Sequence, residues 1–202
     1  VTRPTRVGYT FITWKISNMT TDCTHYYSDT ASTTGAWSNS VAAAQPGASR
    51  EYFYNLRSTS GTVSFVASWQ ANTYSMTYVM NGGTKGTNAP TSATYDVEFT
   101  VDKPLKTGYT FTGWSLTNMS TDCNHYFDGT ATTGASNSTP TRATKFENLR
   151  STSGTVTFTA NWEANIYFVN YVFITYGKGT NTAYLTINKP YYNSTTRVYE
   201  SV

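Results

Sequence analysis

A nine-residue segment, Asn-Leu-Arg-Ser-Thr-Ser-Gly-Thr-Val, occurs at 55–63 and again, unchanged, at 148–156. The surrounding residues repeat as well, because Gly8-Tyr-Thr-Phe-Ile-Thr-Trp14 can be laid over Gly108-Tyr-Thr-Phe-Thr-Gly-Trp114. A repeat of this length can hold a small core of its own. The chain is therefore predicted to be a tandem array of modules rather than a short-repeat solenoid.

The repeats divide the chain into three parts. Residues 1–70 match the later part of a unit, 71–163 form a complete unit, and 164–202 restart the unit. The restart is visible where Ala164-Asn-Ile-Tyr167 matches Ala71-Asn-Thr-Tyr74. We thus expect the first part to lack its opening strands and the last part to consist of opening strands with a tail.

Alternating apolar and polar residues predict half-buried strands at 62–69, at 155–162 and around 95–101. A further alternating run ends in Asn81-Gly-Gly83, which is typical of a tight turn because Asn and Gly tolerate positive φ. No stretch shows sustained helical periodicity. The predicted fold is mainly β, with little helix.

The segment Lys106-Thr-Gly-Tyr-Thr-Phe-Thr-Gly-Trp114, followed by a strand that ends in Ala160-Asn-Trp162, resembles the Listeria-Bacteroides repeat, also called the internalin-type B repeat. The resemblance covers 72–163 and extends to 1–70 without the opening strands. It implies tandem β-grasp-like modules that serve as spacers and adhesion modules on microbial surface proteins, with no catalytic activity attached. Thr13 departs from the motif glycine found at Gly113, so the backbone there need not adopt a positive φ.

The composition favours an extracellular or cell-surface protein. Charged residues are only 12% of the chain, about half the usual share, and Thr and Tyr suit half-wet pleated surfaces. The net charge of +3 comes from scattered basic residues, which argues against a nucleic-acid partner. No apolar run approaches the length of a membrane span. Sequons for N-glycosylation occur at Asn18, Asn118, Asn137 and Asn193.

The motif Asp-Cys-x-His occurs at 22–25 and 122–125 and carries the only cluster of residues with metal or nucleophile chemistry. A structural zinc site needs four nitrogen or sulfur ligands, and one copy supplies two. A disulfide between Cys23 and Cys123 requires equivalent loops of different modules to meet, within one chain or between chains. Buried thiols beside a satisfied histidine are therefore favoured, and we expect no metal, no cofactor and no enzymatic activity.

The aromatic residues divide into core and loop candidates. Repeat-equivalent aromatic residues are predicted to fill the cores: Trp14, Trp69, Trp114, Trp162, Phe11 and Phe111. Trp37 and Tyr52 lie in or near an insert of the first copy and are the candidates for stacking on a sugar ring, although packing on their own module is the favoured interpretation.

The predicted function is that of a structural or adhesive repeat protein, such as a surface stalk or a filament subunit whose partner is another copy of itself. In the filament hypothesis, 164–202 complete the sheet of the first module head-to-tail by strand addition. The candidate residues for this pairing are Tyr167, Val169, Tyr171, Phe173, Leu185 and Ile187. Three alternatives stay open: the partial units are cut ends of a longer array, they close on each other within one chain, or the protein is an adhesin for cell-surface glycans or host proteins.

Overall fold

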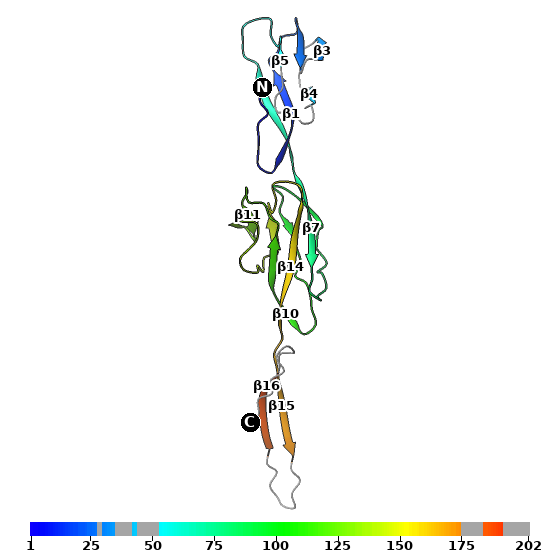
Figure 1. Cartoon of the computed structure of the whole chain (residues 1–202), viewed down its shortest axis with the longest axis vertical. Coiled ribbons are helices and arrows are strands. Elements are labelled where there is room, and N and C mark those ends of the chain that lie inside the picture. Colours follow the sequence, from blue (N-terminus) through cyan, green and yellow to red (C-terminus); the bar gives the residue numbers. More distant parts are fainter. Residues whose placement is uncertain (28–29, 35–41, 44–52, 175–183, 192–202) are drawn as a thin grey trace, which may run out of the picture.

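The computed structural model describes residues 1–27, 30–34, 42–43, 53–174 and 184–191. These residues form strands and no helix, which confirms the mainly-β prediction. The strands fall into three groups that follow one another along the molecule (Figure 1). We call them the first module (β1–β6), the complete module (β7–β14) and the C-terminal hairpin (β15 and β16).

The complete module is built from two sheets of four strands. Their strand orders are β10-β14-β7-β8 and β12-β11-β13-β9. The strands are β7 Thr73–Val79, β8 Ser92–Thr94, β9 Phe99–Thr100, β10 Tyr109–Thr117, β11 His125–Phe127, β12 Thr130–Thr132, β13 Lys145–Glu147 and β14 Thr155–Ala164. The first and last strands, β7 and β14, are neighbours and run parallel, with Met76 opposite Val156. The module is therefore closed by the pairing of its two chain ends.

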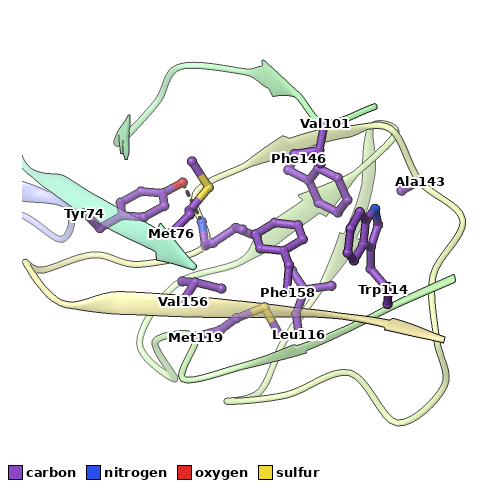
Figure 2. Packing of buried hydrophobic residues seen from close by; sticks show 12 residues of the cluster. Tyr74, Met76, Val101, Trp114, Leu116, Met119, Ala143, Phe146, Val156 and Phe158 are labelled. Atoms are coloured by element: carbon purple, nitrogen blue, oxygen red, sulfur yellow. Dashed lines mark hydrogen bonds between the residues drawn. The ribbon is translucent and has the colours of Figure 1, made fainter. Parts of the chain in front are cut away.

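The core of the complete module lies between these sheets. Alternate residues of β14 point inward, and Val156, Phe158 and Ala160 are fully buried, as the alternating pattern predicts. Phe146 of the second sheet meets Phe158 edge-on, with ring centroids 5.1 Å apart (Figure 2). Trp114 is buried as well, and the described residues offer no acceptor for its indole N–H, so the packing of the ring fixes its position.

Two tight turns use residues with positive φ. The expected turn at Asn81-Gly82 has φ values of 49° and 83°, and the N–H of Gly83 donates to the carbonyl of Met80 over 3.0 Å. Asp128-Gly129 joins β11 to β12 in the same way, with φ values of 48° and 80°.

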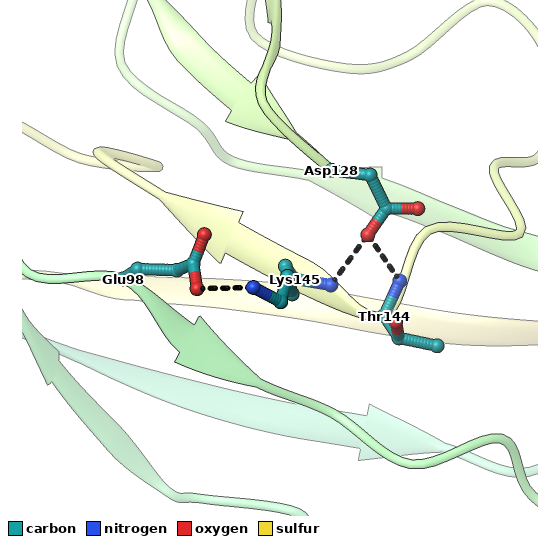
Figure 3. Close-up of polar contacts among 4 residues, drawn as sticks. All are labelled: Glu98, Asp128, Thr144 and Lys145. Carbon is teal, nitrogen blue, oxygen red and sulfur yellow. Dashed lines mark hydrogen bonds and ion pairs between the residues drawn. The ribbon is translucent and has the colours of Figure 1, made fainter.

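The carboxylate of Asp128 also holds the neighbouring strand in place. It accepts backbone N–H groups of Thr144 at 3.0 Å and Lys145 at 2.8 Å (Figure 3). The ammonium of Lys145 lies 3.0 Å from the carboxylate of Glu98, on the β9 side. Both charged side chains are about half exposed, so this ion pair contributes less than about 1 kcal/mol and the backbone contacts of Asp128 matter more.

The strand predicted around 95–101 is mostly wrong. The chain turns at Asp96, where φ is 58°, and only Phe99–Thr100 form a strand. Asp96 donates its N–H to Oδ1 of Asn148 at 2.6 Å, and Nδ2 of Asn148 donates to Oδ1 of Asp96 at 3.0 Å. This paired Asp-Asn contact stabilises the turn against the alternating pattern.

The first module repeats part of this design. Its strands are β1 Tyr9–Ser17, β2 Thr24–Tyr27, β3 Thr30–Thr34, β4 Ala42–Ala43, β5 Phe53–Tyr54 and β6 Ser64–Ala71, in the orders β4-β1-β6 and β3-β2-β5. β1 pairs with β6 as β10 pairs with β14, including a bulge at the equivalent place.

The residue at that bulge differs between the two modules. Gly113 has a φ of 146°, and a Cβ there would lie 2.8 Å from the carbonyl oxygen of Thr141. Thr13 has no positive φ and lies opposite Ala43 instead. The first module therefore accepts a side chain where the complete module requires glycine.

The C-terminal hairpin consists of β15 Tyr167–Ile174 and β16 Tyr184–Tyr191, paired antiparallel along their whole lengths. By register, the candidate positions Leu185 and Ile187 lie opposite Phe173 and Tyr171. Cross-strand partners share a face of the sheet, so these positions lie on the same face of the hairpin.

Candidate functional site

The repeated nine-residue segment forms the same loop in both modules. In the complete module, Nη1 of Arg150 donates to the carbonyl of Asn118 at 2.5 Å, and Ser151 Oγ donates to the carboxylate of Asp122 at 2.7 Å. Gly154 leaves the space that the guanidinium of Arg150 occupies, since a Cβ there would come within 2.7 Å of it.

In the first module, Arg57 donates to the carbonyl of Asn18 and Ser58 Oγ donates to Asp22 at 2.5 Å. The pKa of the Asp22 carboxyl is lowered, first by the Ser58 hydrogen bond and then by Thr20. The same contacts occur in both copies, which indicates that the segment stabilises each module.

The Asp-Cys-x-His motif of the complete module is directed toward this loop. Sγ of Cys123 lies 3.4 Å from the carbonyl oxygen of Asn148, and Nδ1 of the fully buried His125 lies 2.7 Å from the same oxygen. Burial raises the pKa of the Cys123 thiol to about 11, with a further contribution from Asp122. A nucleophilic cysteine needs the opposite shift.

Neither cysteine is part of a disulfide. Cys23 donates to the carbonyl of Asn55 at 3.1 Å, in the same relation that Cys123 has to Asn148. The side chain of His25 lies outside the described residues. The described part of the chain contains no group of three His, Cys, Asp or Glu side chains placed to hold a metal ion.

The second repeated feature is the joint between the first module and the complete module. Asn72 is the single residue between β6 and β7. Its N–H donates to the carbonyl of Gly8 at 2.9 Å, its Oδ1 accepts from the Thr10 hydroxyl at 2.5 Å, and its Nδ2 donates to the carbonyl of Ser151 at 2.7 Å. The carbonyl of Asn72 accepts the N–H of Tyr95 at 2.9 Å. This one residue therefore connects both modules.

The turn at 95–96 completes the joint. The hydroxyl of Tyr9 donates to Asp96 Oδ2 at 2.6 Å, which is the first cause of a raised pKa at Tyr9. The ring of Tyr95 lies against Gly8, where an added Cβ would be only 2.2 Å from it. Burial raises the pKa of Tyr95 to about 12, with a further contribution from Cys123.

The joint between the complete module and the C-terminal hairpin repeats the contacts that Asn72 makes with the module before it. Asn165 donates its N–H to Gly108 at 2.9 Å and accepts from the Thr110 hydroxyl at 2.6 Å. Among the described residues, no atom lies within 4 Å of the Cβ position at Gly108, whereas Gly8 has Tyr95 there. Among the described residues, the downstream half of this joint is therefore missing.

The aromatic candidates form one repeated cluster in each module. Phe11 lies 5.2 Å from Trp14 and 5.7 Å from Trp69, between ring centroids. The equivalent distances from Phe111 to Trp114 and Trp162 are 5.2 and 5.6 Å. Trp14 and Trp114 are buried, whereas the other four residues are partly buried at the edge of each core. Trp37 and Tyr52 lie outside the described residues.

The sequons differ in how their asparagines are placed. Asn18 and Asn118 are exposed, both with a φ of 64°. Asn137 donates Nδ2 to the carbonyl of Trp114 at 2.9 Å, and its Oδ1 accepts the N–H of Leu116 at 2.6 Å, so a glycan there would break a structural contact. Asn193 lies outside the described residues.

Sequence reasoning missed the joint residues Asn72 and Asn165 and the loop arginines Arg57 and Arg150. The signal was present, since all four lie at repeat-equivalent positions.

No family model, curated protein or solved structure matches the chain. None of the described residues belongs to a helix of the length and hydrophobicity that a membrane span requires.

Proposed function

We propose that this chain is a non-enzymatic, extracellular structural repeat protein that acts as a cell-surface stalk or filament subunit. The observation that carries the proposal is the joint at Asn72, where two modules follow each other with a single residue between β6 and β7. A flexible linker would let the modules tumble, whereas this residue bonds to the modules on both sides through backbone and side chain. The joint therefore favours a spacer of fixed length.

The surface and the strand order support the same proposal. Few charges and many Thr and Tyr residues suit an extracellular β protein. The parallel neighbours β7 and β14 at the centre of the sheet support a β-grasp-like unit of the internalin-type B repeat class, the family that the motifs resemble. The thiol of Cys123, with its raised pKa, gives no support to a catalytic role.

Small-angle X-ray scattering at low protein concentration tests the spacer. The wild-type chain should give one extended shape with a well-defined maximum dimension. Asn72→Ala should broaden the distance distribution, because it removes the contacts to Thr10 and Ser151. Asn165→Ala, at the second joint, is the control and should leave the relation of the two modules unchanged. A wild-type profile typical of freely jointed modules would refute the proposal.

A second candidate is an adhesin for glycans, and one hollow favours it. This hollow has a volume of about 490 Å³ and is lined by hydroxyl-bearing side chains together with Phe127, Asn137 and Arg142. An aromatic ring beside polar groups suits a sugar ring. Glycan-array binding that is lost in Arg142→Ala or Trp37→Ala would support this function, and an array without signal would exclude it.

A further inference from the structure

The outer edge of β6 differs from that of its counterpart in the complete module. β14 has β10 on one side and β7 on the other, whereas β6 has β1 on one side and, among the described residues, no strand on the other. The side chains beneath this edge show the consequence. Val156 and Phe158 are fully buried, but their equivalents Val63 and Phe65 are only partly buried.

The C-terminal hairpin carries a strand with the matching pattern. β15 repeats the tyrosine spacing of β7, with Tyr167 and Tyr171 at the positions of Tyr74 and Tyr78, and in the described structure it pairs with β16 alone. Tyr74 of β7 is 2% exposed, whereas its equivalent Tyr167 in β15 is 55% exposed. β7, the counterpart of β15, is an inner strand of its sheet. β15 thus lies at one end of the molecule, and the open edge of β6, which has the matching pattern, lies in the first module at the other end (Figure 1).

We propose that β15 of one copy pairs in parallel with β6 of a second copy, in the register that β7 has on β14. Val169 then lies opposite Val63 as Met76 lies opposite Val156, and Tyr171 lies opposite Phe65 as Tyr78 lies opposite Phe158. The resulting order β1-β6-β15-β16 reproduces the order β10-β14-β7-β8. This inference rests on the proposed structural function and names the partner of that surface.

The joint contacts extend the same match. In the proposed contact, Nδ2 of Asn165 in the donating copy donates a hydrogen bond to the carbonyl of Ser58, as Nδ2 of Asn72 donates to the carbonyl of Ser151 at 2.7 Å. The indole N–H of Trp69 donates to the carbonyl of Phe173, as that of Trp162 donates to the carbonyl of Met80 at 2.9 Å. Each copy then donates at one end and accepts at the other, so the contact is heterologous and repeats head-to-tail into a filament.

Engineered cysteines test the register. Thr77 and Thr157 face each other across β7 and β14, with hydroxyl oxygens 3.2 Å apart. Their equivalents across the proposed contact are Asn170 and Ser64. In the full chain with Cys23→Ser and Cys123→Ser, the pair Ser64→Cys and Asn170→Cys should give a ladder of oligomers after mild oxidation that collapses on reduction.

Two matched pairs control for access and for random collision. Thr77→Cys with Thr157→Cys should form an internal disulfide. Ser64→Cys with Val172→Cys, out of register by two residues, should cross-link about tenfold less, because its Cα atoms lie too far apart for a disulfide. Equal ladders from both pairs, an internal disulfide from the Ser64–Asn170 pair, or no cross-link at all would overturn the proposal.

Mixing two single-cysteine chains separates contact between copies from closure within one chain. Ser64→Cys mixed with Asn170→Cys should yield a mixed dimer, and absence of this dimer would contradict the contact.

Val169→Asp places a charge at an inward position and should abolish assembly, whereas Asn170→Asp, on the outward face, should not. The scattering shape of the isolated chain reports the spacer independently, so loss of the cross-link with an extended monomer refutes the docking and leaves the proposed function standing.

Discussion

Nδ1 of His125 lies 2.7 Å from the carbonyl oxygen of Asn148, and its Nε2 lies 3.1 Å from the carbonyl oxygen of Gly134. A neutral imidazole has one N–H, so the neutral ring satisfies one of these oxygens and the protonated ring satisfies both. In either form the buried ring fills the space between two loops. The histidine of the Asp-Cys-x-His motif is therefore a brace inside the module.

Replacing this brace should destabilise the complete module. His125→Ala removes a fully buried ring together with its hydrogen bonding to the carbonyl oxygens of Asn148 and Gly134, which should cost about 2–4 kcal/mol. Chemical unfolding followed by tryptophan fluorescence measures the loss. Asn124→Ala, an exposed neighbour, is the control and should change the free energy of unfolding by less than about 0.5 kcal/mol. Equal effects of the two changes would contradict the bracing role.

Cys123 should react slowly at neutral pH. Its thiol pKa is raised to about 11 from the ordinary 9.0, mainly by burial, and alkylation requires the thiolate. In a Cys23→Ser chain, the rate of iodoacetamide alkylation should rise about tenfold per pH unit up to about pH 11. The same chain in denaturant should level off near pH 9. A native rate that levels off at the same pH would show that the thiol is not held in this environment.

The sequence predicts the repeat, the alternating strands and the turn at Asn81 because these depend on local pattern. It does not predict the turn at Asp96, because that turn is stabilised by Asn148, a residue far away in the chain. The same limit applies to the joint, where Asn72 contacts Gly8 and Ser151 from two different modules. Contacts of this kind join residues that are distant in the sequence, so a local sequence pattern does not predict them.

High pH should destabilise the complete module through Tyr78. Burial raises its pKa to about 12 from 10.0, so the unfolded chain ionises first and the folded state is disfavoured. The free energy of unfolding should be unaffected by this group below pH 10 and should fall as the pH rises from 10 to 12. Tyr78→Phe should lower the free energy of unfolding by about 1 kcal/mol at pH 8, because it removes the hydrogen bond to the carbonyl of Pro90. Above pH 10 the free energy of unfolding of this variant should fall less steeply than that of the wild-type chain. Parallel curves for the two proteins would exclude this source of pH dependence.

Gly8 and Gly108 offer a matched test of the first joint. Their φ values are 78° and 77°, so an alanine at either position should cost about 1–2 kcal/mol in backbone strain. Gly8→Ala must also displace the ring of Tyr95, whereas in the described part of the chain no atom lies within 4 Å of the Cβ that Gly108→Ala adds. Gly8→Ala should therefore cost about 1–3 kcal/mol more and broaden the scattering profile. Equal costs and equal profiles would mean that the Tyr95 contact does not hold the modules together.

The two modules should unfold in separate steps, and only the first step should depend on protein concentration. The first module has a partly exposed core beneath the β6 edge, so it should unfold at lower denaturant than the complete module. Trp14→Ala should shift the first transition and Trp114→Ala the second, each by about 3–5 kcal/mol.

If a second copy fills the edge of β6, mass action moves the first transition to higher denaturant as the protein concentration increases and leaves the second in place. In Val169→Asp this dependence should vanish, because the donating strand no longer fits; a first transition that is independent of concentration in the wild-type chain would show that the first module folds without a partner strand.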